Sequence, residues 1–208
     1  QAAARSETAR SFWHDLLSDA TVQSLPRWPD SFRPQEQSDG PPAEGMINIP
    51  IPQAVTDGLR ALARLAGATL KSVVLAAHAR VLGFMCNQQD VVTGLIGHGR
   101  PEELGAEQVL GNYLNVLPMR LQLEGGAWIE LVRQALAAEQ RAMPFRRYPM
   151  ANIQRELGGR PLFETALNFS HFHVAEGAEK LESVRVLSVD DWAAGEMRLQ
   201  VNATLNGQ

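Results

Sequence analysis

The stretch at residues 90–123 constrains the fold more than any other part of this chain; it reads DVVTGLIGHGRPEELGAEQVLGNYLNVLPMRLQL. It opens with the short apolar run VVTGLI between Asp90 and Gly97. A run of this kind is typical of a strand that is buried on both faces, as in parallel or mixed sheets. The glycines that follow the run allow close backbone approach and predict an irregular loop. Residues 114–123 then predict a second strand.

Two residues disturb this second predicted strand. Pro118 has no backbone N–H to give to a sheet, so it indicates an edge strand, a bulge or a bend. Asn115 is the one amide in an otherwise apolar half-strand. A buried side-chain amide must be hydrogen-bonded or must face a cavity or a ligand. Asn115 is therefore the first candidate functional residue.

Length and composition are those of an ordinary globular protein. The 208 residues suffice for one large domain or two small ones, and 45% hydrophobic and 20% charged residues indicate a packed core. The net charge of −4 gives no sign of a nucleic-acid or anionic-membrane partner. No apolar run is long enough to cross a bilayer, and we expect no signal peptide. Because Cys86 is the single cysteine, we expect it to be a buried small residue in a cytoplasmic protein.

The first 45 residues are predicted to differ from the rest of the chain. Residues 6–19 carry apolar side chains at helical spacing behind a candidate cap, Ser6 or Thr8. Residues 26–45 are rich in proline, glycine and polar residues. We therefore expect a helix and an extended linker first, and then a compact lobe over residues 46–208.

Two further helices are predicted before the central stretch. Pro52 opens the first and Gly67 ends it, and residues 46–50 before it alternate like a short edge strand. Thr69 caps the second helix, which is predicted to be largely buried through a wide apolar stripe. The stripe consists of Leu70, Val73, Val74, Ala77, Val81 and Phe84. His78 lies beside this stripe, and we interpret it as a core or boundary residue.

The chain after residue 123 predicts two helices and three strands. The helices lie at residues 127–142 and 150–157, and the first is expected to face inward with Trp128, Leu131, Val132, Ala135 and Leu136. The strands lie at residues 162–174, 181–189 and 197–205, and the last alternates apolar with polar side chains. Strands joined by hairpins after helices and a buried strand predict an α/β fold. We expect a two-layer sandwich of a mixed sheet with helices on one side.

No strong catalytic motif is present, because GxSxG, HExxH, GxxxxGK[ST] and CxxC are all absent. His171 and His173 lie on one face of a predicted strand, but no further ligand is placed nearby, so no metal site is expected. His14 and Asp15 are expected at the surface, because adjacent helix positions do not face each other. Arg120 follows an apolar run, and both a strand-end salt bridge and a functional role are compatible with it.

Five segments resemble one known family in sequence and in order. They are SFWHDLL, TLKSVVLAAHARVL, DVVTGLIGHGR, LGNYLNVLPMR, and YPMANIQREL followed by PLFETALNF. The fourth contains the pattern Gly-x-x-x-Asn-x-x-Pro-x-Arg at Gly111, Asn115, Pro118 and Arg120. Over residues 6–175 the chain thus resembles the C-terminal half of a condensation domain from a nonribosomal peptide synthetase.

The resemblance implies a chloramphenicol-acetyltransferase-like fold, in which two similar lobes meet in a V around a tunnel. Two carrier proteins deliver thioesters on phosphopantetheine arms, and the amine of one attacks the thioester of the other. This chain would be one lobe, with no bound cofactor of its own. It would supply a tunnel wall, to which we assign Asn115, Tyr113, His98 and Arg120.

The family's catalytic His-His-x-x-x-Asp-Gly motif belongs to the other lobe, and none of the five histidines here has a histidine neighbour. We therefore expect half of an acyltransferase, inactive alone and without a catalytic residue of its own. The expected partners are the N-terminal lobe of the same domain and carrier-protein domains. A homodimer of the fragment is expected through the surface that the other lobe would cover. A non-catalytic carrier-binding lobe, epimerisation and ester formation stay as alternatives.

Overall fold

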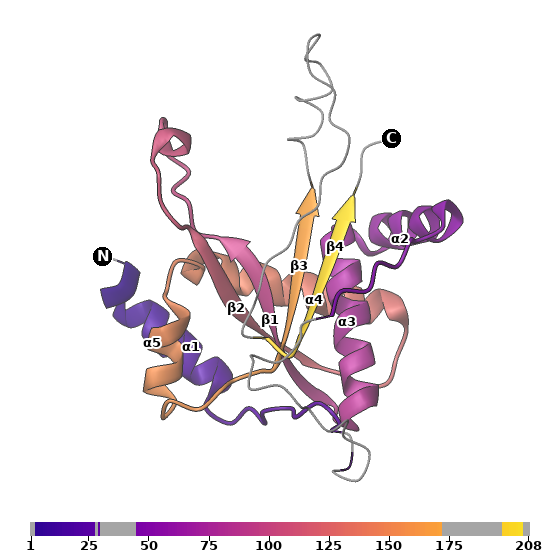
Figure 1. Cartoon of the computed structure of the whole chain (residues 1–208), viewed down its shortest axis with the longest axis horizontal. Helices are drawn as coiled ribbons and strands as arrows, with labels where there is room; N and C mark the ends of the chain where they lie inside the picture. Colours follow the sequence, from indigo (N-terminus) through magenta and orange to yellow (C-terminus); the bar gives the residue numbers. More distant parts are fainter. Residues whose placement is uncertain (1–2, 28, 30–44, 172–196, 206–208) are drawn as a thin grey trace.

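The computed structural model describes residues 3–27, 29, 45–171 and 197–205. Figure 1 shows how its elements surround one sheet. In chain order they are η1 (Ala3–Arg5), α1 (Glu7–Leu17), α2 (Gln53–Ala66), α3 (Leu70–Cys86), β1 (Asp90–His98), η3 (Ala106–Gln108), β2 (Leu114–Gln122), α4 (Trp128–Ala142), η4 (Met143–Phe145), α5 (Met150–Glu156), β3 (Thr165–His171) and β4 (Leu199–Leu205).

The four described strands form one mixed sheet in the order β2-β1-β3-β4. β1 pairs antiparallel with β2 and parallel with β3, and β3 pairs parallel with β4. β1 is central and is buried from Val91 to Leu95, as its apolar run predicts. Pro118 lies on β2, which is an edge of this sheet in the described part of the chain, so the missing N–H costs little there.

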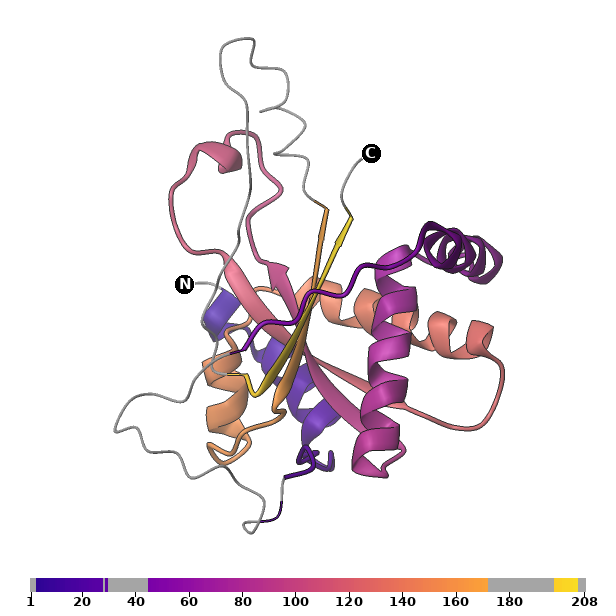
Figure 2. The same cartoon turned by 45° about the vertical axis from the view of Figure 1, so that its right-hand side comes forward.

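The helices cover the sheet unevenly. α3 and α4 pack against each other over one face, α3 on β1 and β3 and α4 on β2. α1 and α5 pack together beside β2, as both views show (Figure 1 and Figure 2). The buried Trp13 and Leu17 join α1 to the same apolar core as the sheet and α3. The predicted α/β sandwich with a mixed sheet is confirmed.

The helix ends follow the sequence signals closely. Ser6 Oγ accepts a hydrogen bond from Ala9 N at 3.2 Å, and Thr69 Oγ1 accepts one from Ser72 N at 3.1 Å. Each hydroxyl satisfies a backbone N–H that the first helical turn leaves without a partner. Gly67 ends α2 in the left-handed region with φ of 64°, where glycine carries no steric penalty.

The buried side of α3 differs from the predicted apolar stripe. Val81 and Phe84 of that stripe are 53% and 77% exposed, and only its Val73 is fully buried. The buried residues are Ser72, Val73, Leu75, Ala76, His78, Ala79, Leu82 and Gly83. Apolar side chains occur almost all around α3, so the sequence pattern does not fix which side faces the core. The contacts with β1 and α4 select it instead.

Several other predictions differ from the structure. Residues 46–50 form no strand and are exposed, because Pro50 lacks a donor and no described strand pairs with them. Trp128 is the first residue of α4 and is 53% exposed, so it does not face inward as predicted. Cys86 is half-buried at the end of α3 rather than enclosed. The predicted strands at 162–174 and 197–205 appear as β3 and β4, whereas 181–189 lies outside the described residues.

Among the described residues, no single helix is both long and apolar enough to cross a membrane. α2 and α3 pass that test only as a pair, which is bent by 103°. Eight of the 17 residues of α3 are buried inside the protein.

Candidate functional site

Three of the four predicted wall residues gather at the root of the loop that joins β1 to β2. His98 is the last residue of β1 and pairs with Leu114, and Asn115 lies opposite Gly97 on the same ladder. Tyr113 immediately precedes β2. The loop itself stands away from the rest of the protein in both views (Figure 1 and Figure 2). The antiparallel pairing of β1 with β2 therefore brings these side chains to one end of the sheet.

Tyr113 is held in place by Gly99 and Arg100, the two residues that follow β1. Its carbonyl accepts a hydrogen bond from Gly99 N at 2.7 Å, which extends the β1–β2 pairing by one bond. The guanidinium of Arg100 lies over its ring, with Cζ 4.3 Å from the ring centroid. A Cβ at Gly111 would lie 3.4 Å from the same ring, so the chain at Gly111 passes within contact distance of Tyr113. Backbone, cation and ring together fix the end of the loop.

Asn115 connects this root to the segment between η4 and α5. Its Nδ2 donates to the carbonyls of Arg146 and Tyr148, both at 2.9 Å. Both donor protons of the amide are thereby used, and no described residue donates to its Oδ1. The chemistry that Asn115 can still provide is therefore that of a hydrogen-bond acceptor. The amide is hydrogen-bonded, as its half-buried position requires.

Charged and phenolic groups surround this connection. Arg146 pairs with Glu102 of the loop at 2.5 Å, and Arg147 Nη2 lies 3.5 Å from the Arg100 carbonyl. The hydroxyl of Tyr148 donates to Glu156 at 2.6 Å, and burial with this carboxylate raises the pKa of Tyr148 to about 12. Sequence reasoning missed these residues. Those of the later segment lie more than 30 positions along the chain from Asn115, and nothing local signals that the two segments meet; they are Arg146, Arg147, Tyr148 and Glu156.

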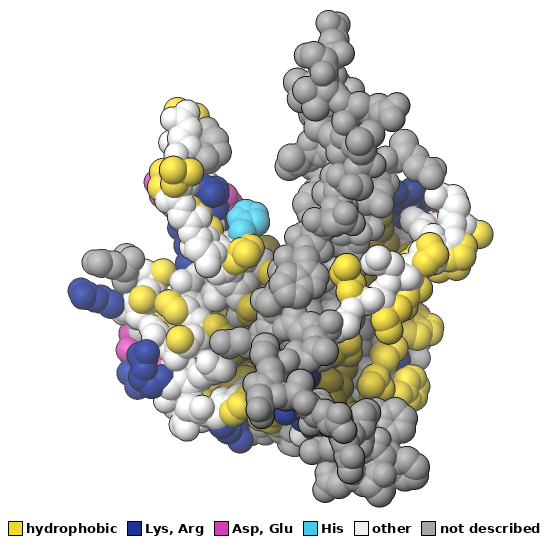
Figure 3. All heavy atoms as spheres, in the orientation of Figure 1, with side chains coloured by type: hydrophobic (Ala, Val, Ile, Leu, Met, Phe, Trp, Pro, Cys, Tyr) yellow, Lys and Arg dark blue, Asp and Glu magenta, His cyan; other side chains and the backbone are white. Residues whose placement is uncertain are grey.

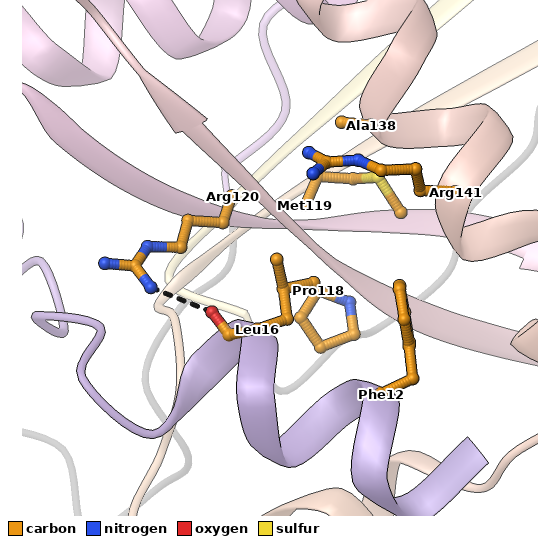
Figure 4. A pocket seen from close by; sticks show the side chains of 7 residues that line it. All are labelled: Phe12, Leu16, Pro118, Met119, Arg120, Ala138 and Arg141. Atoms are coloured by element: carbon orange, nitrogen blue, oxygen red, sulfur yellow. Dashed lines mark hydrogen bonds between the residues drawn. The ribbon is translucent and has the colours of Figure 1, made fainter. Parts of the chain in front are cut away.

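Arg120 lies at the opposite end of β2, away from this site. Its guanidinium pairs with Asp90 at 2.7 Å and Asp19 at 2.5 Å, and donates to the Leu16 carbonyl at 2.8 Å (Figure 4). Hydrogen bonds to these carboxylates raise the pKa of Arg120, and the pKa of Asp19 is lowered in turn. The cavity beside it holds about 10 Å³, room for roughly one water molecule. The geometry is that of the strand-end salt bridge, which ties α1 to the sheet.

The histidines do not form a metal site or a catalytic pair in the described residues, where no group of three candidate ligands occurs. His78 is buried and its Nε2 lies 3.0 Å from Thr93 Oγ1, which confirms its interpretation as a core residue. Burial lowers the pKa of His78 to about 4. His14 is exposed, 3.6 Å from Asp15. His171 ends β3, and nothing is described of its side chain or of His173.

A larger hollow of about 480 Å³ lies between the start of α3 and the end of α4. It is lined by Thr69, Lys71, Leu136, Glu139, Gln140, Met143, Pro144 and Arg146. Glu139 is buried there, where it accepts from Ser72 Oγ and from Lys71 Nζ, each at 2.7 Å. Because Ser72 is fully buried and the carboxylate is paired, this cluster joins the two helices and presents no accessible nucleophile.

The comparison with known proteins decides the family. Condensation domains match residues 1–200 of the chain. The chain belongs to the condensation-domain family. The AMB antimetabolite synthetase AmbE of Pseudomonas aeruginosa is 36% identical over an alignment of 203 residues, which covers 91% of this chain and 9% of AmbE. Malpinin synthetase of Mortierella alpina is 34% identical over 164 residues, covering 77% of this chain and 2% of that protein.

Solved condensation domains share the fold. The first condensation domain of the calcium-dependent antibiotic synthetase superposes with a TM-score of 0.65 at 24% identity, over 82% of this chain and 36% of that one. A four-domain nonribosomal peptide synthetase bound to AMP and glycine gives a TM-score of 0.68 at 17% identity, over 87% of this chain and 14% of that one. The chain thus spans about a third of a solved condensation domain and less than a tenth of AmbE and of malpinin synthetase.

Proposed function

We propose that this chain is the C-terminal lobe of a condensation domain that joins carrier-bound aminoacyl or peptidyl thioesters through an amide bond. The match of residues 1–200 to condensation domains carries this proposal. In the reaction, the acceptor amine attacks the thioester carbonyl of the donor. A C–N bond forms, the C–S bond breaks, and the amine proton leaves with the thiol of the donor arm.

The chemical step depends on a part of the domain outside this chain. No two of the five histidines are adjacent, so the His-His-x-x-x-Asp-Gly motif is absent from the sequence given. The role proposed for this lobe is to form one wall of the tunnel with His98, Tyr113 and Asn115. Because Asn115 has only its Oδ1 to offer, it suits an N–H group of the acceptor amine better than an oxyanion.

The proposed partners are the N-terminal lobe and carrier domains that bring phosphopantetheine arms. The tip of the β1–β2 loop supports the first of these, because Leu104 and Leu110 are 107% and 96% exposed there. Figure 3 shows apolar side chains at the top of this loop. Large apolar side chains that are held out in water tend to mark a contact surface. We place the reaction in the cytoplasm, where the single half-buried Cys86 stays reduced.

One observation favours a second candidate. A lobe without the histidine pair is also what a non-catalytic carrier-binding scaffold would contain. Ester formation and epimerisation stay as alternatives under the resemblance described above, and their products distinguish them from amide formation.

The product on the acceptor arm separates these functions, when mass spectrometry is combined with base hydrolysis of esters and with chiral chromatography. The complete condensation domain would be incubated with loaded donor and acceptor carrier proteins of the same synthetase, and the acceptor arm analysed. An amide-linked product is expected. A product linked through an ester, or an acceptor with inverted configuration, would contradict amide formation. Carrier binding without any new product would establish the scaffold.

A further inference from the structure

One guanidinium joins three parts of the β1–β2 loop. Arg100 lies two residues after the end of β1, and its Nη1 donates to the carbonyls of Ala106 at 2.6 Å and Val109 at 2.7 Å. These carbonyls lie at the start of the short helix η3 and at its C-terminal cap. The face of the same guanidinium covers the Tyr113 ring at the other end of the loop. Arg100 therefore links the beginning, the tip and the end of the loop.

These contacts need the shape of arginine as well as its charge. The N–H groups lie in the guanidinium plane and reach the two carbonyls, while the flat face stacks on an aromatic ring. A lysine ammonium at position 100 would keep the charge, but it could not make the planar stack. Substitution of Arg100 by lysine thus separates the effect of charge from the effect of geometry.

The loop depends on Arg100 more than the sheet does. Gly99 N donates to the Tyr113 carbonyl, and His98 pairs with Leu114, through backbone groups alone. Loss of the guanidinium leaves this ladder intact. It removes two of the hydrogen bonds that order residues 101–112, and long loops with few internal contacts open easily.

We propose that Arg100 is a positioning residue of the condensation reaction, which acts by holding the Tyr113 ring at the tunnel wall. This role rests on the proposed function, which assigns Tyr113 to that wall. A fixed ring lets the wall bind the substrate in one geometry without further ordering. The chemical step belongs to the other lobe, so loss of Arg100 weakens substrate binding and leaves that step unchanged.

Hydrogen exchange on this chain tests the structural half of the proposal. In Arg100→Ala, amides of residues 101–112 should exchange on the order of 10-fold faster, while those of β1 and β2 keep their rates. Arg80→Ala is the matched control, because it removes another arginine–ring contact, 5.9 Å from the Phe84 ring centroid on α3. Equal exchange of residues 101–112 in the wild type and in Arg100→Ala would overturn the proposal.

Steady-state kinetics of the complete domain test the functional half, with the aminoacyl carrier protein of the same synthetase as the varied substrate. Arg100→Ala should raise KM by roughly 5- to 50-fold and change kcat by less than about 2-fold, with Arg100→Lys in between. A lower kcat at unchanged KM would indicate less folded enzyme and would refute positioning. A wild-type domain that forms no amide would refute the proposed function and this role in it, while the exchange result would still decide whether Arg100 holds the loop.

Discussion

At the scale of single residues, Asn115 is a connection between two segments of the chain. Its two donor protons serve the carbonyls of Arg146 and Tyr148. Asn115→Ala would leave both carbonyls without this partner, so we expect the free energy of unfolding to fall by about 1–3 kcal/mol. Urea unfolding of the chain measures this loss.

A neighbouring asparagine provides the control for that measurement. Asn112 Oδ1 accepts one hydrogen bond, from Leu114 N at 3.0 Å, in an exposed position. Asn112→Ala should change the free energy of unfolding by less than about 0.5 kcal/mol. Equal stability of Asn115→Ala and Asn112→Ala would mean that the connection through Asn115 contributes nothing measurable.

His78 makes the stability of the protein depend on pH. Its pKa is about 4 in the folded protein, against 6.5 when unfolded, because it is buried against Thr93. The unfolded chain therefore binds the proton first as the pH falls. Stability that is fully present above pH 6.5 is lost between pH 6.5 and pH 4, and the loss at pH 5 is about 2 kcal/mol.

A variant without a titrating group isolates the contribution of His78. His78→Gln keeps a polar side chain near Thr93 but does not titrate between pH 5 and pH 7. Urea unfolding at these two values should show a larger stability loss in the wild type than in the variant. A loss of the same size in both proteins would show that other groups cause the pH dependence.

The sequence predicted single residues well where their partners are local. The Ser6 and Thr69 caps bond groups three positions away, so the sequence contains both partners. Asn115 was identified as a polar residue in an apolar strand, but its partners lie 31 and 33 positions away. Such distant contacts depend on the fold, and for that reason Arg100 was seen only as part of a motif.

At the scale of elements, two substitutions in α3 test which side of this helix packs against the core. Leu75 is fully buried, whereas Val81 of the predicted stripe is 53% exposed. Leu75→Ala should lower the free energy of unfolding by about 2–5 kcal/mol, while Val81→Ala changes it by less than about 0.5 kcal/mol. Thermal or urea unfolding of the two variants decides this, and the reverse order would place the core on the predicted stripe.

Helices and strands were predicted correctly where their hydrophobic periodicity agrees with the residues that begin and end them. They were predicted wrongly where packing against other elements decides the structure. The helices, the buried β1 and the alternating β4 all carry such signals. Residues 46–50 alternate like a strand, yet a strand also needs a partner, and none is described beside them. The prediction of which side of α3 is buried was wrong for a related reason. A helix with apolar residues on all sides has no sequence pattern that shows which side packs against its neighbours.

At the scale of the whole molecule, the described part of the chain exposes apolar surfaces that the proposed partner lobe would cover. Large exposed apolar side chains occur on the loop tip, on the segment before α2 and on α3, and Figure 3 shows several of them together on the right-hand side. Those of the first two regions include Leu104, Leu110, Ile47 and Ile49. We expect the isolated chain to form a dimer through part of this surface.

Light scattering coupled to size exclusion, across a concentration series, tests this expectation. Leu104→Ser with Leu110→Ser should weaken the dimer if the loop tip forms the contact. Ile47→Ser with Ile49→Ser should weaken it if the segment before α2 does. A monomer at every concentration in the wild type would show that these side chains do not drive association.

We propose that this chain forms one lobe of a condensation domain and that the catalytic centre lies in the other lobe. Amide formation from loaded donor and acceptor carrier proteins tests this proposal most directly, with the isolated chain and the complete domain assayed side by side. Background product is expected from the isolated chain, and product far above background is expected from the complete domain. Product well above background from the isolated chain would contradict it, because a chain without the histidine pair would then contain a catalytic centre of its own.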